Sequence, residues 1–329
     1  MNKALITGGA GFIGSHLAQR LLANGYEVYI LDNLSTGSLA NLSEFSPHER
    51  LHIHTGEVTD PSLLLPLIDK VDCIYHLAAS VGVKNIMDNL ISSVTNNIDS
   101  TIAVLEAASR AGKKVLLTST SEVYGKGGLS PSTEMDDLRM GDTTKSRWSY
   151  ACSKALDEYL AFAYAYERGA AVTVVRLFNT VGDRQTHAFG MVIPTFIRQA
   201  LQDKPITIFG DGTQSRCFGY VKDVVWALHK LMEHPSSLNN IYNIGSTEKV
   251  TMNELADAII TATHSRSQKI YIPYQQAYKK GFEDAASRYP DISKVQALIG
   301  FVPHYTLADI ISITAAHIAQ DQAQEMAQA

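Results

Sequence analysis

A glycine-rich turn near the start of the chain constrains its fold more than any other feature. Residues 7–14 (TGGAGFIG) directly follow a short apolar run and open a segment with helical periodicity. Gly8 permits a tight turn, Gly11 lets a phosphate approach the backbone, and Gly14 lets the helix pack closely on the strand. This order predicts a strand, a phosphate-binding loop and a helix; the alternative is that the glycines only shape a tight turn.

Short apolar runs alternate with longer segments of helical periodicity through the first 118 residues. The runs occupy residues 4–6, 28–31, 51–53, 73–77 and 115–117, with helices predicted at 16–24, 62–68 and 91–111 and later strands at 172–176 and 241–244. Such alternation is typical of a parallel sheet with helices on both faces. The predicted fold class is α/β, a Rossmann-type doubly wound parallel sheet.

The pattern changes beyond about residue 180. Residues 182–185 (GDRQ) and 210–214 (GDGTQ) indicate loops, whereas 192–202 indicate a helix and 206–209 a strand. We expect residues 1–180 to form the Rossmann domain and 181–320 mainly a smaller C-terminal α/β substrate lobe, with some chain returning to the sheet. Residues 321–329 are expected to form a polar, frayed tail.

Composition excludes several classes of protein. The 329 residues are 45% hydrophobic and 19% charged, which suits a large packed core, and a net charge of -5 leaves no basic field for nucleic acid. The three cysteines are widely separated, which argues against a disulfide framework and a structural metal site. No apolar run has the length of a membrane span, and a strand starting at Lys3 leaves no room for a signal peptide. We expect a cytoplasmic protein without membrane or nucleic-acid partners.

An acidic residue at the end of the second predicted strand indicates which dinucleotide binds. Asp32 stands eighteen residues after Gly14, where a carboxylate accepts hydrogen bonds from the adenosine ribose. It would repel a 2′-phosphate, and residues 33–36 (NLST) contain no arginine, so NAD is favoured over NADP. Residues 76–79 (HLAA) offer small side chains where the backbone would pass under the cofactor, although ordinary core packing explains them too. The predicted cofactor-binding residues are Gly8, Gly11, Phe12, Ile13, Gly14, Asp32, Asn33, Leu77, Ala78, Ala79, Tyr150 and Lys154.

A tyrosine and a lysine four residues apart suggest proton-transfer chemistry. Tyr150 and Lys154 would share one face of a helix running to about residue 168. A lysine ammonium lowers the pKa of a neighbouring phenol, which lets the phenolate act as a base while the lysine holds the nicotinamide ribose. The bare spacing is common, so a chance surface pair is the alternative.

The predicted strand before this helix ends in hydroxyl and carboxylate side chains. Residues 118–125 (TSTSEVYG) would bring Thr120 and Glu122 to the carboxyl edge of the sheet, where ligands bind in such folds. Thr120 is positioned to share a proton with a substrate hydroxyl. A carboxylate there is costly unless it does acid or base work or meets a partner, so Glu122 is a candidate catalytic residue; the alternative is a rim residue paired with an arginine.

Taken in order, these motifs resemble the extended short-chain dehydrogenase/reductase family of nucleotide-sugar epimerases, dehydratases and decarboxylases, over nearly the whole chain. The resemblance implies that NAD stays bound through turnover. It also implies that Tyr150 takes a proton from the sugar C4 hydroxyl as hydride passes to NAD, with Thr120 assisting. A homodimer is expected, through helices at 91–111 and 150–168.

The resemblance also places residues of the second lobe around a nucleotide sugar. Asn179, Arg216 and Arg288 match positions that bind the diphosphate, and Val192 and Phe209 match positions that flank the base. Two arginines suit that charge, with surface salt bridges as the alternative. If the sugar is a hexuronate, one of Arg184, Lys84 or Ser121 is expected near its carboxylate, because a buried anion needs a donor.

The reaction within this family is less sharply indicated. Residues 118–125, 178–184 (FNTVGDR) and 212–218 (GTQSRCF) look like UDP-glucuronate decarboxylases, whereas 76–83 (HLAASVGV) lacks their proline-rich loop and looks like UDP-sugar 4-epimerases. A decarboxylase is therefore expected, with a 4-epimerase of UDP-glucuronate or UDP-glucose as the alternative and a nucleotide-sugar 4,6-dehydratase behind both. A non-catalytic NAD-binding sensor is the rival from another class.

Overall fold

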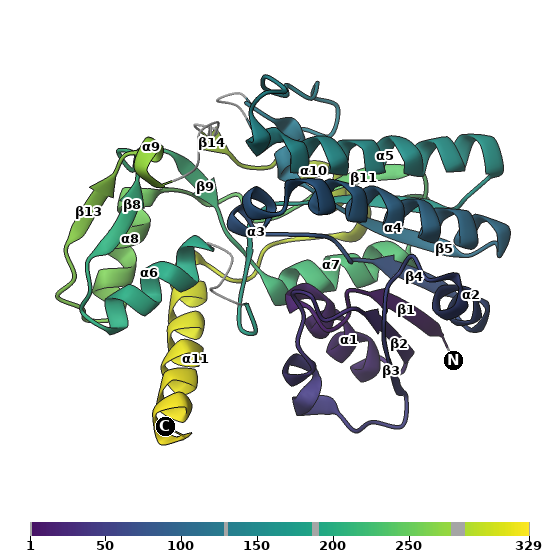
Figure 1. Cartoon of the computed structure of the whole chain (residues 1–329), viewed down its shortest axis with the longest axis horizontal. Coiled ribbons are helices and arrows are strands. Elements are labelled where there is room, and N and C mark those ends of the chain that lie inside the picture. Colours follow the sequence, from purple (N-terminus) through teal and green to yellow (C-terminus); the bar gives the residue numbers. More distant parts are fainter. Residues whose placement is uncertain (1, 128–130, 186–190, 278–286, 329) are drawn as a thin grey trace.

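Seven parallel strands form the central sheet of the computed structural model, which describes residues 2–127, 131–185, 191–277 and 287–328 (Figure 1). Their order across the sheet is β11-β6-β5-β4-β1-β2-β3. The strands are β1 (Lys3–Thr7), β2 (Glu27–Asp32), β3 (Leu51–Thr55), β4 (Cys73–His76), β5 (Lys114–Thr120), β6 (Val172–Leu177) and β11 (Asn240–Ile244). Each predicted apolar run is a strand, which confirms the Rossmann-type sheet.

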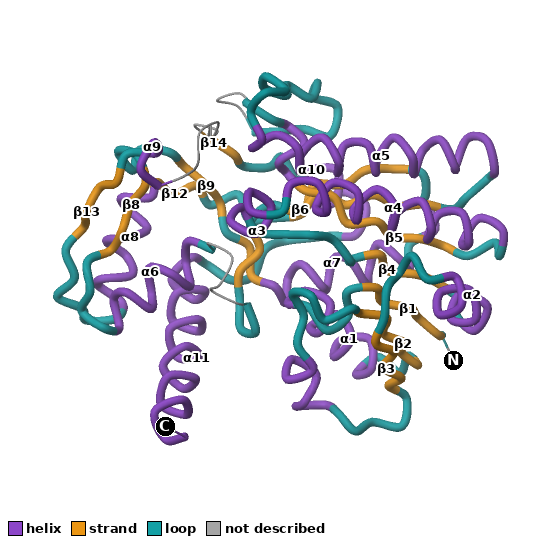
Figure 2. The backbone as a smooth tube through the Cα atoms, in the orientation of Figure 1, coloured by secondary structure: helices purple, strands orange, loops and turns teal. Residues whose placement is uncertain are grey.

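Alternate side chains of the strands pack into two cores on opposite faces of the sheet. Ala4 and Ile6 of β1 belong to one core, and Leu5 between them belongs to the other, as the two-residue period of a strand requires. Helices α1 (Phe12–Ala23) and α7 (Val221–Glu233) cover the first face, and α2 (Pro61–Lys70), α4 (Leu90–Arg110) and α5 (Ser149–Arg168) cover the second (Figure 2).

A smaller lobe built from the later part of the chain lies beside the sheet (Figure 1). It contains the pair β8 (Ile206–Phe209) and β13 (Lys269–Ile272), the three-stranded sheet of β12 (Lys249–Thr251), β9 (Ser215–Cys217) and β14 (Ser287–Arg288), and the helices α6 (Val192–Leu201), α8 (Met252–Ala262) and α9 (Tyr274–Ala277). Strand β11 and helix α7 return to the large sheet. The exact division at residue 180 stays a prediction.

Two short strands, three further helices and four 3-10 turns complete the described chain. They are the short strands β7 (Thr180–Val181) and β10 (Gly219–Tyr220), the helices α3 (Val83–Asp88), α10 (Ser293–Ile299) and α11 (Leu307–Gln328), and the 3-10 turns η1 (Leu39–Phe45), η2 (Ser121–Tyr124), η3 (Ser146–Trp148) and η4 (Pro235–Ser237). The prediction of a frayed tail is wrong, because α11 continues to Gln328. Alanine, glutamine, glutamate and methionine favour helix there, and Ile310, Ile311 and Ile318 anchor its earlier turns in the core.

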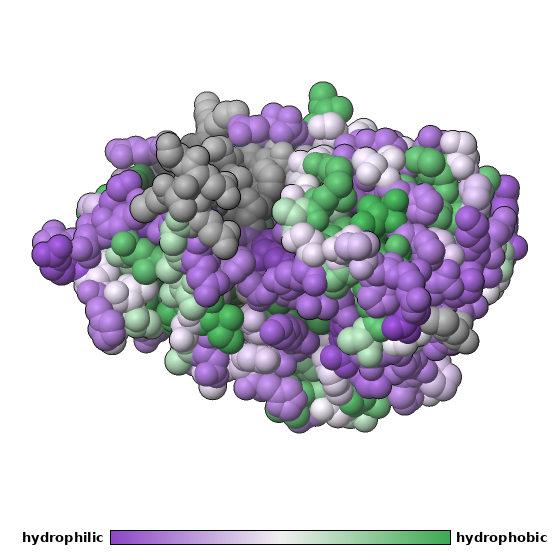
Figure 3. Space-filling model, turned by 90° about the horizontal axis from the view of Figure 1, so that it is seen from below, coloured by the Kyte–Doolittle hydropathy of each residue, from purple (hydrophilic) through white to green (hydrophobic). Residues whose placement is uncertain are grey.

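The outer surface is mostly polar on the face drawn in Figure 3, where apolar side chains form scattered groups. None of the helices in the described ranges combines the length and hydrophobicity that a membrane span requires. Within the same ranges, no three His, Cys, Asp or Glu side chains gather as metal ligands would.

Candidate functional site

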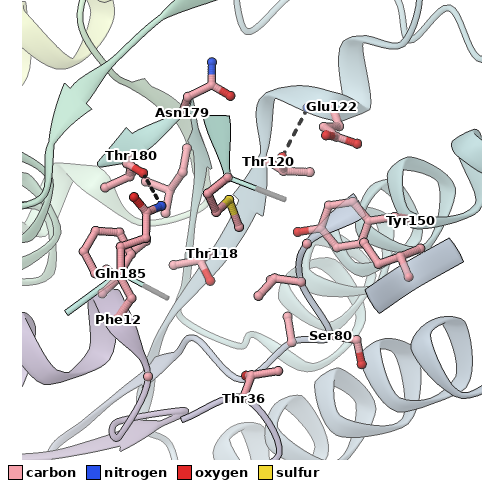
Figure 4. A pocket seen from close by; sticks show the side chains of 18 of the residues that line it. Phe12, Thr36, Ser80, Thr118, Thr120, Glu122, Tyr150, Asn179, Thr180 and Gln185 are labelled. Atoms are coloured by element: carbon pink, nitrogen blue, oxygen red, sulfur yellow. Dashed lines mark hydrogen bonds between the residues drawn. The ribbon is translucent and has the colours of Figure 1, made fainter. Parts of the chain in front are cut away.

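A cavity of about 650 Å³ lies at the carboxyl ends of the central strands. The strand order reverses at β1, because the chain moves from β1 to β2 and β3 on one side and then crosses to β4 on the other. Such a switch point is where open α/β sheets bind ligands. Figure 4 shows Phe12 and Thr36 toward one part of the cavity and Thr120, Glu122 and Tyr150 toward another.

The glycine loop packs closely against the end of β4 and the start of α1. Gly8 has a φ of +72°, and a Cβ there would lie 2.8 Å from the backbone nitrogen of Ala78. A Cβ on Gly14 would lie 2.2 Å from the Gly8 carbonyl oxygen, so any side chain would push the loop away from the helix. Helix α1 follows Gly11, which caps it without a side chain and leaves its first N–H groups open to an anion.

Asp32 closes the loop at the end of β2. Its Oδ2 accepts a hydrogen bond from the Ala10 N–H at 2.9 Å and its Oδ1 accepts one from the Leu34 N–H at 2.8 Å. Asp32 lines the cavity, and each carboxylate oxygen keeps a second lone pair for a ribose hydroxyl. The neighbouring Asn33 donates to Glu57 at 3.1 Å. Phe12, Ile13, Leu77, Ala78 and Ala79 also line this part of the cavity.

The predicted catalytic side chains meet where β5 and α5 face the cavity. Thr120 ends β5, and Tyr150 and Lys154 lie one turn apart on α5. Burial and the carboxylates of Glu122 and Asp157 raise the pKa of Tyr150, against a smaller lowering by Arg147 and the Thr120 hydroxyl. Tyr150 is therefore a neutral phenol at neutral pH.

Glu122 is the centre of a buried ionic cluster. Both of its carboxylate oxygens accept hydrogen bonds from Arg147, with Nη2 at 2.9 Å from Oε1, and Arg288 Nη1 lies 3.4 Å from Oε1. Burial raises the pKa of Glu122, but the two guanidinium groups outweigh it and hold the pKa at about 2. Glu122 is thus ionised at neutral pH and has no proton to donate.

The residues expected around the diphosphate and base lie on adjacent elements of the second lobe. Arg216 and Arg288 stand directly opposite each other on the paired strands β9 and β14. The Asn179 amide donates to the carbonyl of Cys217 at 3.0 Å. Val192 begins α6 and Phe209 ends β8. The buried Ser121 lines the cavity. The five residues expected around the diphosphate and base line it too: Asn179, Val192, Phe209, Arg216 and Arg288.

Arg184 does not take the place expected of it. Its guanidinium donates to Glu44 at 2.6 Å and to Gln19 at 2.9 Å, and it lies over the ring of Phe45. It is not among the cavity-lining residues, whereas Ser121, another of the three donors considered for the hexuronate carboxylate, does line the cavity. The side chain of Lys84 lies outside the described residues.

Two residues of the site escaped the sequence analysis. Arg147 supplies the main partner of Glu122, and Asp157 accepts a hydrogen bond from Lys154 at 2.8 Å. Both stand three residues from a member of the tyrosine and lysine pair. The spacing of three residues on a helix is the sequence signal that could have placed Asp157 beside Lys154. Arg147 precedes the helix, so no periodic pattern marked it.

Comparison with known proteins agrees with this geometry. A UDP-N-acetyl-alpha-D-glucosaminuronate decarboxylase of Bacillus cytotoxicus is 41% identical over 303 residues, covering 92% of this chain and 93% of that protein. UDP-glucuronic acid decarboxylase 1 of Danio rerio is 36% identical, covering 97% and 73%. The structure of UDP-glucuronic acid 4-epimerase from Bacillus cereus, in complex with UDP-glucuronic acid and NAD, is 29% identical with a TM-score of 0.88, covering 97% and 99%.

The family assignment is broader than any one of these likenesses. Residues 4–245, from the first strand of the sheet to the end of β11, match the NAD dependent epimerase/dehydratase family. This range includes the glycine loop, Asp32, Thr120 and the tyrosine and lysine pair. The predicted cofactor and enzyme class are confirmed, and the chain belongs to the NAD dependent epimerase/dehydratase family.

Proposed function

We propose that this protein removes CO2 from a UDP-linked hexuronate through transient oxidation of the sugar at C4. The observation that carries the proposal is the ionic cluster of Glu122, Arg147 and Arg288 beside Thr120 and Tyr150. Two arginines against one carboxylate leave this cluster with net positive charge, which suits a substrate that is itself an anion. The similar proteins of Bacillus cytotoxicus and Danio rerio, both named as decarboxylases of such sugars, support the same reaction.

The cofactor end of the cavity would hold NAD. The N–H groups after Gly11 would hold its diphosphate, Asp32 its adenosine ribose and Lys154 its nicotinamide ribose. When bound, NAD would supply the acceptor for the C4 hydride and the source of its return. The loop packs tightly at this end, because there is no space for a side chain at Gly8 or Gly14 between the loop, α1 and the end of β4.

Tyr150 would take the proton of the C4 hydroxyl, and Thr120 would share it. Since burial and two carboxylates raise the pKa of Tyr150, deprotonation requires positive charge close to the phenol. The Lys154 ammonium supplies part of that charge, one turn away on α5.

Loss of CO2 follows from the chemistry of the oxidised sugar. A ketone at C4 makes the C6 carboxylate part of a β-keto acid. The C5–C6 bond breaks, CO2 leaves, and its electron pair moves through C5 to the C4 oxygen as an enolate. C5 then takes a proton and C4 is reduced, which gives a UDP-pentose. Because Glu122 is ionised, it serves as an acceptor that fixes the arginines and not as the acid at C5.

The second lobe would bind the nucleotide. Arg216 and Arg288 would pair with the diphosphate, Asn179 would bond to it, and Val192 and Phe209 would enclose the base, with uracil as the expected base. Ser121, buried beside Glu122, is the remaining donor expected near the hexuronate carboxylate.

Assembly and location complete the proposal. Exposed apolar side chains gather on α4 and α5, the helices expected at the dimer interface: Ile91, Ile102, Leu156, Tyr159 and Tyr166. They support a homodimer, which light scattering on the purified protein would test. The three cysteines are free thiols, which supports the cytoplasm as the location.

The test is to incubate the purified protein with UDP-glucuronate, and separately with UDP-N-acetylglucosaminuronate, without added NAD. Mass spectrometry should show the loss of one CO2 from at least one of the two, and proton NMR should identify a UDP-pentose. An unchanged mass with a new C4 proton pattern would establish a 4-epimerase instead. Two untouched substrates would overturn the proposal.

A further inference from the structure

A carboxylate without solvent exposure contacts the lysine of the catalytic pair. Asp157 Oδ2 accepts a hydrogen bond from Lys154 Nζ at 2.8 Å, and the two side chains are 0% and 3% exposed. Asp157 does not line the cavity, and its hydrogen bond to the catalytic pair is made to Lys154. Burying a carboxylate is costly, and its lysine partner offsets that cost only if the geometry is good.

A series of buried polar groups surrounds this pair and leads to the phosphate loop. The Thr101 hydroxyl of α4 stabilises the Asp157 carboxylate, and its Oγ1 lies 3.3 Å from His76 Nε2. His76 Nδ1 lies 2.7 Å from the hydroxyl oxygen of Thr7, the residue before Gly8. Asp157 Oδ1 has no hydrogen bond of normal geometry to any described residue. The position of Asp157 is therefore set chiefly by Lys154.

We propose that Asp157 is a positioning residue for the Tyr150 and Lys154 pair. It fixes the Lys154 ammonium through their ion pair and offsets part of the positive charge that this ammonium presents to the Tyr150 phenol. The inference rests on the proposed function in one respect, because it requires Tyr150 to be the group that takes the C4 proton.

The charges around the pair determine the sign of the effect. The ionisable groups that face it are Glu122 of η2, Arg147 of η3, Arg288 of β14, His76 of β4, and Asp157 and Glu158 of α5. His76 is neutral, since burial and the charge of Lys154 lower its pKa to about 3. Glu122 is neutralised by its two arginines and Glu158 by Arg176 at 2.7 Å, which leaves Asp157 as the carboxylate bonded to Lys154.

Removing the charge of Asp157 should therefore lower the pH at which Tyr150 gives up its proton. Asp157→Asn keeps the shape of the side chain and removes the charge. On whichever UDP-sugar the wild-type protein converts, we expect the acid limb of kcat/KM to move to lower pH by about one unit. Asp157→Glu should restore the limb toward its original position. A merely structural role would lower the rate at every pH and leave the limb in place.

A second readout needs no turnover. The tyrosinate absorbance of the NAD-loaded Asp157→Asn variant, minus that of the same variant with Tyr150→Phe, reports the titration of Tyr150 alone. Its midpoint should fall by about the same amount relative to the matched wild-type pair. Because no substrate is used, this result stands even if decarboxylation is not the reaction.

Asp157→Ser provides a second charge-removing variant in case the amide disturbs the helix packing. Thermal unfolding and NAD content identify which variants are folded and loaded. An unmoved acid limb together with an unmoved titration midpoint, in a folded variant that holds NAD, would overturn the proposal.

Discussion

At the cofactor end of the cavity backbone segments pack closely against one another, whereas at the sugar end charged side chains meet. Gly8, Gly14 and Ala78 approach one another so closely that no added Cβ fits between them. Glu122, Arg147 and Arg288 instead meet as ions from three separate elements. The first arrangement is limited by space and the second by charge balance. The two ends should therefore fail in different ways when they are altered.

The largest effect is expected where the two ends meet, at Tyr150. Tyr150→Phe removes the proton acceptor and leaves the cavity walls intact, so turnover should fall by about 10³-fold or more. The bound NAD should remain, because the glycine loop is unchanged. Turnover and NAD content of the purified protein measure both. Tyr166→Phe, on the same helix and 92% exposed, is the matched control. Near-normal turnover of Tyr150→Phe would remove this residue from the mechanism.

Removing a charge at the sugar end should lower the free energy of unfolding more than removing one at the protein surface. Arg147→Gln leaves Glu122 with Arg288, at 3.4 Å, as its ion-pair partner, and the pKa of Glu122 should rise from about 2. Breaking such a buried pair costs about 3 kcal/mol in free energy of unfolding, which urea titration measures.

The matched control for that experiment is an exposed pair of the same chemistry. Arg168 pairs with Glu106 and its side chain is 49% exposed, so Arg168→Gln should cost less than about 1 kcal/mol. Equal losses for the two variants would show that burial of the Glu122 cluster does not govern its energy.

The cofactor end should be sensitive to volume. A Cβ at Gly14 would lie 2.2 Å from a backbone oxygen, so Gly14→Ala must move the loop at a cost of about 2 kcal/mol. The NAD retained after gel filtration should fall with it. Gly112→Ala is the control, because φ there is +64° and a Cβ would meet nothing within 4 Å. That variant carries backbone strain of about 1 kcal/mol without a clash. Full NAD retention by Gly14→Ala would contradict the steric account.

The two ends should also lose stability in different pH ranges. Burial and the charge of Lys154 lower the pKa of His76 from 6.5 to about 3. Its stabilising contribution is present above pH 6.5, and it is lost as pH falls toward 3 because the unfolded chain takes up the proton first. This one residue should reduce the free energy of unfolding by about 1.4 kcal/mol per pH unit. The pKa of Glu122 is lowered from 4.5 to about 2, so protonation of Glu122 reduces the free energy of unfolding only below about pH 4.5.

His76→Gln cannot take up that proton and isolates the contribution. Between about pH 6.5 and pH 5, urea unfolding should show a shallower loss of stability for the variant than for the wild type, by about 2 kcal/mol over the whole interval. Parallel curves would mean that His76 is not held neutral in the folded protein.

The same contrast explains what the sequence could predict. The glycine loop, Asp32 and the Tyr150 and Lys154 pair are local patterns, and each lies at the cavity as expected. The partners of Glu122 come from residues 147 and 288, and no local pattern records which arginine reaches which carboxylate. Arg184 shows the same limit, since Glu44, far away in the sequence, decides where its guanidinium lies. The polar composition of the last residues also suggested a tail, although their helix propensity and an apolar anchor produce α11.

The most direct test of the account is to run the reaction with UDP-glucuronate, or its 2-acetamido counterpart, in deuterium oxide and locate the deuterium in the product. We expect a UDP-pentose that carries one solvent deuterium at C5, where CO2 departed, and the original hydrogen at C4, because the hydride removed from C4 is returned to it. Deuterium at C4, or a product that keeps its carboxylate, would contradict decarboxylation through transient oxidation at C4.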